Sequence, residues 1–374
     1  MVSQSFKADF LIVGCGFAGA TFARMVAENG YTSHIIDKRD HIGGHSYTYR
    51  DEETQVEIHK YGPHIFHTSS KEIWGFMNRF TSFNNFVNRV KAMTGGQVYS
   101  LPINLHTVNQ FFHKNLNPSD AEKFIDHIKH KNLNVTNFEE SLLSSIGQEL
   151  YEAFFKYYSI KQWGVDPKEI VVSTAKRLPI RFNYNDNYYN DTYQGIPIDG
   201  YTKIFERMLN HPNIKVFVET DFDEYKNNWR QKYKSLVYTG SIDEYFNYRF
   251  GYLPYRAVVF NELRGTEIQG NAVINYTDKS VPYTRIHEHK WFIPDIKFEG
   301  SIAFEEYSES TDSRKNPFYP IRNNESDRLY NKYLNLTTEE DGVIFIGRLA
   351  EFKYYDMHQV IGSAISKSKD FMKR

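Results

Sequence analysis

The chain has 374 residues, a length that usually divides into two or three domains. Its formal net charge of −1 argues against a large nucleic-acid surface and leaves room only for a small, locally basic pocket. Tyrosine and phenylalanine are abundant, and most of them are expected in the core, although tyrosine also suits sugar and base surfaces.

The cysteine content and the N-terminal composition point to a reducing compartment. Cys15 is the single cysteine, so no intramolecular disulfide forms, and nothing near it marks an activated thiol. Residues 1–10 lack the apolar segment of a signal peptide, and no run approaches the length of a membrane span. We therefore expect a cytoplasmic protein without a membrane span.

The first elements have the pattern of a β-α-β unit. Residues 9–13 form an apolar run typical of a buried parallel strand. Residues 18–30 follow a helical pattern that Gly30 ends, and residues 33–37 predict the next strand. This arrangement is the usual beginning of a nucleotide-binding domain.

A helical pattern extends from about residue 70 to 178. Asn117 is expected to cap a helix that carries Pro118 in its first turn. Thr136 is expected to begin a capping box. Residues 149–158 continue as helix, with aromatic side chains at three- and four-residue spacings.

The remaining segments favour strands and loops. Residues 54–68 are strand-like, and residues 181–197 suit a loop or an irregular strand because they are rich in Asn, Asp and Tyr. Residues 244–308 alternate β-prone runs with turns, which predicts an antiparallel sheet. Residues 342–372 read as strand, glycine turn and helix, so the chain returns to its first domain and the domains are expected to interleave.

Three glycines between the first strand and the first helix form a GxGxxG motif. Its spacing alone is weak evidence, but the flanking strand and helix make it good evidence for a dinucleotide site. Gly14 permits the tight turn, Gly16 lets a pyrophosphate approach the backbone, and Gly19 lets the helix pack on the strand. Asp37 ends the next strand, where an acid accepts hydrogen bonds from ribose hydroxyls and argues against NADP.

The choice between NAD and FAD depends on later glycines. A second pair, Gly43-Gly44, follows the acid, and this order looks like the FAD-binding half of large two-domain flavoproteins. The last strand–glycine–helix segment fits too, because in such proteins it returns to hold the flavin. A second GxGxxG motif is absent, which argues against a pyridine-nucleotide disulfide reductase. FAD is therefore the expected cofactor.

Motifs distributed over nearly the whole chain resemble those of bacterial UDP-galactopyranose mutases. They read IHKYGPHIFHT, NRVKA, SLPINLHTVNQFF, ELYEAFFKYYSIKQWG, KRLPIRFNYNDNYYND, YQGIP, VPYTRIHEHK and GRLAEFKYYDMHQ. The resemblance implies an isomerase that interconverts UDP-galactopyranose and UDP-galactofuranose without net redox and is active only with reduced FAD. In the scheme for this family, flavin N5 attacks the anomeric carbon and UDP leaves. The sugar–flavin adduct opens to an iminium, the ring recloses through the 4-hydroxyl, and UDP reattaches.

The same resemblance implies an architecture and partners. The expected fold class is α/β, with a Rossmann-type FAD-binding domain, an inserted helical bundle domain and a twisted antiparallel β-sheet domain. The FAD-binding domain is expected at residues 1–78, 196–243 and 325–374. The helical domain, with the uridine contacts and a mobile loop, is expected at 79–178, and the sheet domain at 179–195 and 244–324. Family members imply a homodimer, an electron donor such as NAD(P)H, and product flux into cell-surface polysaccharide; no nucleic-acid partner is expected.

If the cofactor is the nucleophile, the protein need only position, desolvate and neutralise charge. Arg177 and Arg285 match the family's two diphosphate-binding arginines, and an arginine fork suits phosphate oxygens. Arg177 falls in a segment that resembles the mobile loop, whose closure would exclude water. His67 matches the histidine closest to the reactive face of the flavin, and Asp356 matches the acid near sugar and flavin.

The resemblance also assigns substrate and cofactor contacts. The expected substrate contacts to uridine, diphosphate and sugar are Phe154, Tyr158, Trp163, Tyr188, Asn88, Asn275, Tyr319, Tyr354 and Arg348. The expected cofactor contacts are Gly14, Gly16, Phe17, Ala18, Gly19, Asp37, Lys38, Gly44, His45, His64, Ile65, Gly347, Arg348, Asp356 and Met357. No metal site is expected, because the histidines near residue 64 lack an HExxH motif or a cysteine partner.

Several alternatives stay open on the sequence. A flavin oxidase or dehydrogenase of related fold, or a non-catalytic nucleotide-sugar binder, would share these motifs. Some family members accept UDP-N-acetylgalactosamine, and His59 and Lys168 are candidates for shaping the pocket at the sugar 2-position. Tyr189 stands where the family often has Phe, so the effect of its hydroxyl on uridine or phosphate contacts is open.

Overall fold

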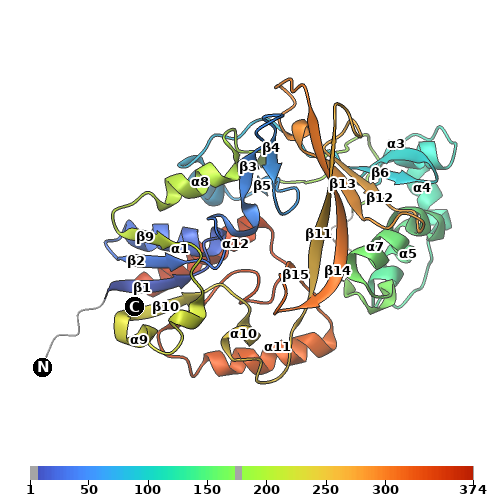
Figure 1. Cartoon of the computed structure of the whole chain (residues 1–374). Coiled ribbons are helices and arrows are strands. Elements are labelled where there is room, and N and C mark those ends of the chain that lie inside the picture. The colour runs from blue at the N-terminus through green and yellow to red at the C-terminus, as the bar shows by residue number, and fades with distance from the viewer. Residues whose placement is uncertain (1–6, 173–178, 374) are drawn as a thin grey trace, which may run out of the picture.

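The computed structural model describes residues 7–172 and 179–373. Figure 1 shows a parallel sheet on the left and a larger sheet on the right, with helices around both. Within the described residues the parallel sheet has five strands in the order β16-β10-β1-β2-β9, and every neighbouring pair is parallel. The strands are β1 (Ala8–Val13), β2 (Ser33–Ile36), β9 (Ile214–Phe217), β10 (Tyr233–Tyr238) and β16 (Val343–Phe345).

Both faces of the parallel sheet are covered, which explains the nearly continuous apolar run of its central strand β1. Phe10 and Ile12 of β1 belong to one buried cluster, whereas Leu11 between them belongs to another. The first cluster includes side chains of α1 (Phe17–Ala27), α2 (Lys71–Asn78), α8 (Gly200–Leu209) and α12 (Met357–Met372). The second includes side chains of α9 (Trp229–Lys232), α10 (Ile242–Tyr245) and α11 (Asn324–Thr337).

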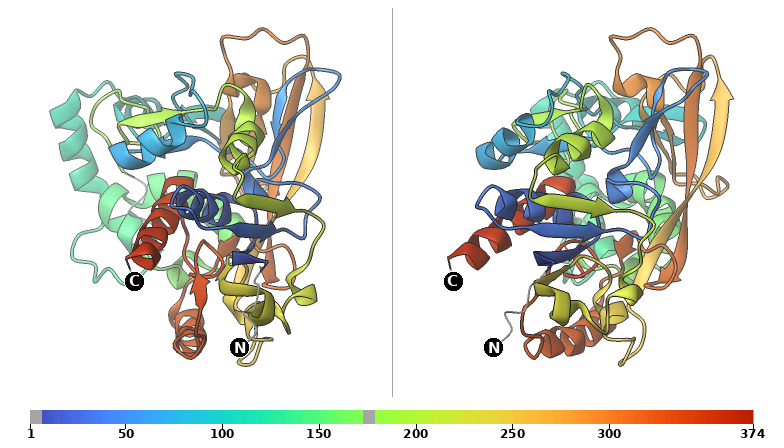
Figure 2. Two further views of the ribbon diagram at one scale, coloured as in Figure 1. Left: turned by 90° about the vertical axis from the view of Figure 1, so that its left-hand side faces the viewer. Right: turned by 60° about the vertical axis from the view of Figure 1, so that its left-hand side comes forward.

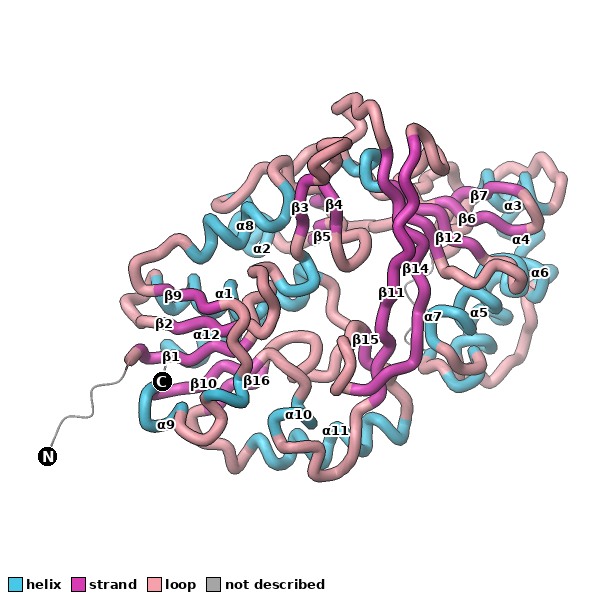
Figure 3. The backbone as a smooth tube through the Cα atoms, in the orientation of Figure 1, coloured by secondary structure: helices cyan, strands magenta, loops and turns pink. Residues whose placement is uncertain are grey.

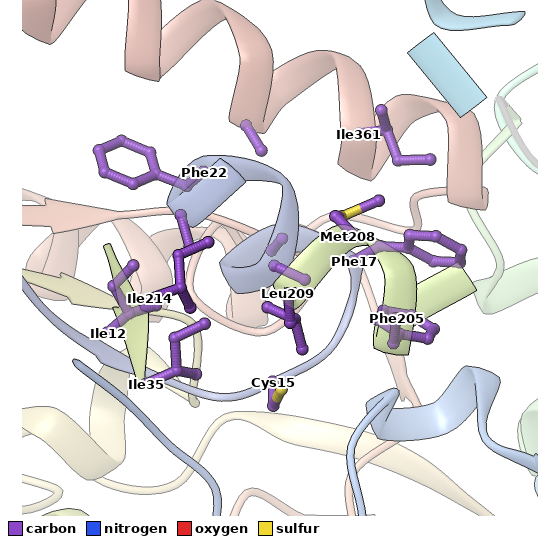
Figure 4. Packing of buried hydrophobic residues seen from close by; sticks show 14 of the residues in the cluster. Ile12, Cys15, Phe17, Phe22, Ile35, Phe205, Met208, Leu209, Ile214 and Ile361 are labelled. Carbon is purple, nitrogen blue, oxygen red and sulfur yellow. The ribbon is translucent and has the colours of Figure 1, made fainter. Parts of the chain in front are cut away.

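Figure 2 shows α1 and α12 side by side along the parallel sheet from two further directions. Figure 4 shows Phe17 of α1 together with Phe205 and Met208 of α8, with Ile361 of α12 above them and Ile12 and Ile35 of the sheet to their left; all of these side chains belong to one buried cluster. Close packing of this kind fixes the start of α1 against the ends of the strands.

The larger sheet is built on a long hairpin. Its order within the described residues is β15-β11-β14-β13-β12-β6-β7. The hairpin strands β11 (Pro254–Gly265) and β14 (Ser301–Asp312) are the long magenta pair of Figure 3. The others are β6 (Lys91–Thr94), β7 (Gln97–Ser100), β12 (Val273–Tyr276), β13 (Arg285–Glu288) and β15 (Tyr319–Pro320). The predicted antiparallel pairing is confirmed except between β12 and β6, which are parallel.

One feature of the expected organisation is wrong. Residues 91–100 are predicted to be helical, but they form β6 and β7 and extend the larger sheet, because Gly95 and Gly96 make a tight left-handed turn between them. The segment 179–195, predicted to belong to the sheet domain, contains the strand β8 (Tyr193–Gly195), which pairs antiparallel with β5 (Phe66–Thr68) in a separate small sheet. Another small sheet joins β3 (Thr48–Arg50) to β4 (Glu57–His59).

The helices between β7 and β8 pack on one face of the larger sheet through a shared apolar cluster. Those that the structure describes are α3 (Leu105–Phe111), α4 (Pro118–Ile128), α5 (Phe138–Ile146), α6 (Gln148–Tyr151), a π-helix (Glu152–Lys156) and α7 (Tyr157–Trp163). Asn117 caps α4 ahead of Pro118, as predicted. The cap of α5 is Asn137 rather than Thr136, because the Asn137 side chain accepts the backbone N–H of Glu140.

The described residues also include short 3-10 helices at Gly44–Ser46, Pro167–Glu169, Phe222–Glu224 and His289–Phe292. Among the residues that the structure describes, no helix has both the length and the apolar character needed to cross a bilayer. The strands of the parallel sheet come from three separated stretches of the chain, so the expected interleaving of segments is visible in the topology. The domain boundaries given above stay a prediction.

Candidate functional site: three cavities

The glycine loop makes a sharp turn from β1 into α1. Gly14 has φ +97°, a left-handed conformation that other residues rarely adopt. A Cβ on Gly19 would collide with the Gly14 carbonyl oxygen, so glycine at this position lets the helix meet the strand. Gly16 is the N-cap of α1, and no side chain of the described residues caps it there. The first-turn N–H groups are therefore available to an anion such as a pyrophosphate.

A cavity of about 240 Å³ lies beside this turn and is lined by Gly14, Asp37 and Lys38 among others. Asp37 is only 3% exposed, and its Oδ2 accepts the backbone N–H of Cys15 at 2.8 Å. Its Oδ1 accepts the backbone N–H of Arg39 at 3.0 Å. These bonds hold the carboxylate at the end of β2, where a ribose hydroxyl would find an acceptor.

Close backbone approach explains three more of the expected cofactor residues. A Cβ on Gly44 would lie 3.1 Å from the Cα of Gly16, and a Cβ on Gly347 would lie 3.0 Å from the Cβ of Ala18. These contacts bring the loop after β2 and the loop after β16 against the start of α1. Phe17 behaves differently, because its ring packs in the core 4.6 Å from the ring of Phe205. A cofactor contact from Phe17 would therefore use its backbone.

Burial makes the thiol of Cys15 unreactive. Desolvation raises the pKa of its thiol to about 12, and the neighbouring carboxylate of Asp37 adds to the rise. A thiol with that pKa carries almost no thiolate at neutral pH, and the thiolate is the nucleophilic form.

A second cavity, of about 130 Å³, gathers most of the other expected cofactor residues. Those that line it are His45, His64, Ile65, Arg348, Asp356 and Met357, and His67, which is predicted to be catalytic, lines it too. Burial lowers the pKa of His64 to about 4 and that of His45 well below its ordinary value. The His45 ring stacks on Phe318 at 4.1 Å, and its buried Nε2 finds no hydrogen-bond partner among the described residues. A flat heterocycle with polar edges fits such a mixed lining.

A third cavity, of about 430 Å³, adjoins the second. Five residues line both cavities: His67, Tyr189, Arg285, Tyr354 and Asp356. The third cavity is otherwise lined by aromatic and amide side chains predicted for the substrate, namely Phe154, Tyr158, Trp163, Tyr188 and Asn275. The buried Oδ1 of Asn275 has no partner within residues 7–172 and 179–373, so it can accept a hydrogen bond from a ligand.

The aromatic wall of the third cavity depends on an irregular helix. Residues 149–158 are helical as expected, but the middle of this stretch is the π-helix, which carries Phe154. A π-helix shifts the angular position of later side chains, and it often occurs at functional sites. Trp163 ends α7 just before Gly164, whose φ of +70° turns the chain away, and its ring lies 5.7 Å from that of Tyr354.

Arg285 supplies a fixed positive charge at the junction of the two cavities. It begins β13, and its Nε donates to Oε2 of Glu306 at 2.7 Å. Glu306 is fully buried on the adjacent strand β14. Burial alone would lower the pKa of Arg285, but the Glu306 carboxylate more than offsets it and raises that pKa well above its ordinary value. Arg285 therefore stays protonated in a site that excludes much of the solvent.

Other predicted residues are placed around this junction. The guanidinium of Arg348 lies 5.1 Å from the ring centre of Tyr319, and its Nη2 donates to the backbone oxygen of Tyr355 at 2.7 Å. Tyr319 lines the second cavity. Asn88 is buried and lines neither cavity, but its backbone oxygen accepts the N–H of Tyr188 at 2.8 Å. Arg177 lies outside the described residues.

Two residues suggested for the sugar 2-position do not line these cavities. His59 is buried, with its ring stacked at 4.9 Å on Phe292. Lys168 is exposed, and its Nζ lies 3.8 Å from the carboxylate of Glu139. Neither belongs to the lining of the second or the third cavity, so these linings give the suggestion no support and it stays a prediction.

Sequence reasoning did not single out Asp191, Glu306 or His358. Asp191 contacts His67 from 124 residues away, and no local motif marks that pairing. Ligand-capable atoms of His67, Asp356 and His358 lie within 4.8 Å of one another. Two of these three, His67 and Asp356, line the second cavity.

Comparison with known proteins identifies the family. A family model described as UDP-galactopyranose mutase matches residues 153–354, more than half of the chain. This chain belongs to the UDP-galactopyranose mutase family. A second model, for an NAD(P)-binding Rossmann-like domain, matches residues 12–80. The family and this domain together imply a flavin, and the resemblance and fold class inferred from the sequence are confirmed.

Two relatives cover nearly the whole chain. A probable UDP-galactopyranose mutase of Klebsiella pneumoniae is 45% identical over 97% of this chain and 94% of its own length. A dTDP-fucopyranose mutase of Escherichia coli is 43% identical over 97% of this chain and 98% of its own length. Mutases are isomerases, so the expected class of enzyme is confirmed.

Solved structures share the fold at low sequence identity. The structure of a reduced UDP-galactopyranose mutase has a TM-score of 0.74 at 15% identity and covers 98% of this chain and 96% of that one. A putative protoporphyrinogen oxidase of Exiguobacterium has a TM-score of 0.66 at 11% identity, over 99% and 100%. The likeness to both shows that a mutase and an oxidase can share this fold.

Proposed function

We propose that this protein interconverts UDP-galactopyranose and UDP-galactofuranose with bound FAD and without net redox. The observation that carries the proposal is the junction between the aromatic third cavity and the second cavity, which share Arg285, His67 and Asp356. An aromatic compartment with one fixed arginine suits a uridine diphosphate sugar, because uracil stacks on rings and a diphosphate needs a cation.

The protein's own residues then have distinct tasks. Phe154, Tyr158 and Trp163 bind the uracil and ribose through ring contacts in the third cavity. Arg285, held by Glu306, neutralises the diphosphate as UDP leaves and returns. Arg177 is proposed as the second cation of this pair. Reduced FAD, when bound, supplies the nucleophile for the anomeric carbon.

The cofactor position follows from the first two cavities. The pyrophosphate of FAD would lie at the N-terminus of α1, with a ribose on Asp37 and the ring system beside His45, His64 and Ile65. Both histidines favour the neutral form near pH 7, so they would contact the ring system as uncharged groups. An external electron donor such as NAD(P)H is proposed to reduce the flavin.

The nature of the sugar nucleotide is a separate question. Relatives of nearly equal similarity carry the names UDP-galactopyranose mutase and dTDP-fucopyranose mutase. A dTDP-fucose substrate is therefore the second candidate, and UDP-N-acetylgalactosamine is a third. We favour UDP-galactose because the matching family model bears that name and covers most of the residues that line the third cavity.

The deciding experiment is chromatography of each sugar nucleotide after incubation with dithionite-reduced holoenzyme. We expect a furanose product from UDP-galactose with reduced protein and none with oxidised protein. A higher kcat/KM with dTDP-fucose than with UDP-galactose would make dTDP-fucose the assigned substrate and leave the class of reaction unchanged. Bleaching of the oxidised flavin by substrate alone would instead identify an oxidase or dehydrogenase. Binding of UDP-galactose without product at any redox state would identify a nucleotide-sugar binder.

We also infer a cytoplasmic homodimer that feeds galactofuranose into cell-surface polysaccharide. The family resemblance supports these inferences. Sedimentation of the purified holoenzyme tests the dimer, since a monomer at micromolar concentration would contradict it.

A further inference from the structure

Asp191 and His67 form a short, directed pair at the edge of the site. His67 lies in β5, and Asp191 lies two residues before β8, the strand that pairs with β5. Nδ1 of His67 is 2.6 Å from Oδ2 of Asp191. The other carboxylate oxygen, Oδ1, accepts the Ser69 hydroxyl at 2.7 Å, and Ser69 Oγ accepts the backbone N–H of Thr192 at 3.3 Å. The strand pairing therefore holds both partners in place.

The pair fixes which nitrogen of His67 carries the proton. Partial burial by itself raises the pKa of Asp191, but hydrogen bonds from His67 and Ser69 lower it below its ordinary value. An ionised carboxylate only accepts hydrogen bonds, so Nδ1 of His67 must be the donor. In the neutral ring, Nε2 then carries the lone pair.

The His67 ring is also confined on its other sides. Tyr189 stacks face to face on it, with centroids 3.7 Å apart and an interplanar angle of 11°. His358 meets it edge to face at 4.9 Å. His67 lines both the second and the third cavity, where sugar and cofactor are proposed to meet. A ring with its Nδ1 bound and its face covered offers Nε2 as the remaining polar atom.

We propose that Asp191 is a positioning residue that holds His67 as the Nδ1–H tautomer, with Nε2 as a proton acceptor for a sugar hydroxyl. This inference rests on the proposed function. A pyranose ring closes through O5 and a furanose ring through O4, so one proton leaves O4 and one joins O5. When the pyranose ring opens, the imidazolium of His67, which the Nδ1–H bond to Asp191 stabilises, gives the proton on Nε2 to O5. When the furanose ring closes, the neutral Nε2 takes the proton from O4, and the imidazolium is restored.

The first test reads the tautomer and needs no turnover. Full-length oxidised holoenzyme is labelled with ¹⁵N-histidine, and the His67 signals are assigned by their loss in His67→Gln. We expect the Nδ1–H tautomer in the unmodified protein and its loss in Asp191→Ala. Asp40→Ala is the matched control, because Asp40 lies 3.9 Å from Nε2 of His41, and its side chain is 73% exposed. His67 signals that stay unchanged in Asp191→Ala would overturn the proposal.

The second test separates positioning from a structural role. Asp191→Asn should lower kcat about 10- to 100-fold, the usual loss when an orienting carboxylate is removed, with KM for UDP-galactose and flavin content within a factor of three. Asp191→Glu should restore part of that loss. Ser69→Ala removes one hydrogen bond to Asp191 but keeps the contact between Asp191 and His67, so it should lower kcat only a few-fold. This variant replaces the Asp191 variants in the test if those fold poorly. Full kcat in Asp191→Asn, or a larger loss in Ser69→Ala, would refute the assignment.

Failure of the proposed function would look different. If the reduced unmodified protein made no furanose from any sugar nucleotide, the proton-transfer role would be refuted together with the proposed function. The NMR result would still report whether Asp191 sets the tautomer of His67.

Discussion

At the scale of single residues, the expected cofactor site depends on a few buried polar atoms whose partners the structure identifies. Asp37 is the clearest of these, since both of its oxygens accept backbone N–H groups, from Cys15 and Arg39. A carboxylate can accept further hydrogen bonds at each oxygen, so these contacts orient Asp37 without saturating it. Its orientation toward the first cavity supports the predicted ribose contact.

The prediction at this scale concerns flavin retention. Asp37→Ala should weaken FAD binding roughly 10- to 100-fold, because a lost hydrogen bond to a charged group is worth about 1.5–3 kcal/mol. The measurement is flavin occupancy after gel filtration, followed by titration of the apoprotein with FAD. Asp37→Asn keeps an acceptor oxygen and should lose less. Unchanged occupancy in Asp37→Ala would show that the carboxylate serves the turn alone.

At the scale of elements, the contact of α1 with β1 decides whether the phosphate site exists. A Cβ added to Gly19 would collide with the Gly14 carbonyl oxygen and would lie 3.1 Å from a methyl carbon of Ile12. Added volume at such a close contact forces the helix away from the strand. The N–H groups at the start of α1 would then move away from the phosphate position.

We therefore expect Gly19→Ala to destabilise the protein by about 1–3 kcal/mol, the usual effect of overpacking, and to reduce FAD retention. The matched control is Gly75→Ala in α2, where an added Cβ meets no atom within 4 Å. That change should raise stability by about 0.5–1 kcal/mol through helix propensity alone. Thermal unfolding and flavin occupancy of both variants are the measurements. Equal behaviour of the two variants would contradict the packing argument.

At the scale of the whole molecule, neutral histidines are buried where the small β3–β4 sheet meets the larger sheet. His59, His287 and His289 are each at most 1% exposed, and their rings lie near one another. Burial lowers the pKa of His289 to about 3 and that of the other two well below the ordinary value. The unfolded chain binds a proton near pH 6.5 at each of these sites, whereas the folded protein does not.

These histidines make the folded protein less stable at acid pH. Below pH 6.5 the unfolded state binds more protons than the folded state, so the stability supplied by these neutral rings is complete above that pH and is lost as pH falls. Each histidine contributes a slope of up to about 1.4 kcal/mol per pH unit between pH 6.5 and 5. His289→Asn should reduce the slope by about that amount, and exposed His130→Gln should not. The slope is measured by urea unfolding of the FAD-saturated proteins at several pH values. Equal slopes in the unmodified protein, His289→Asn and His130→Gln would refute the role of the buried histidines.

Much of this fold could be predicted because its rules are local. The φ of +97° at Gly14, the cap at Asn117 and the buried runs of β1 and β2 follow from residue types within a few positions of each other. The strands β6 and β7 could not be predicted in the same way. Their residues lie next to a helical stretch, and their pairing with β12 depends on a chain segment about 180 residues away.

The sequence by itself determined the nucleotide loop, the acid after β2, the family and many of the residues that line the second and third cavities, because these are short motifs with steric or charge requirements of their own. Only the tertiary structure decided that Asp191 orients His67 and that Glu306 holds Arg285. It also decided that Phe17 turns into the core. The physical reason is that a hydrogen bond between distant residues depends on strand register, and register is set by the packing of the whole sheet.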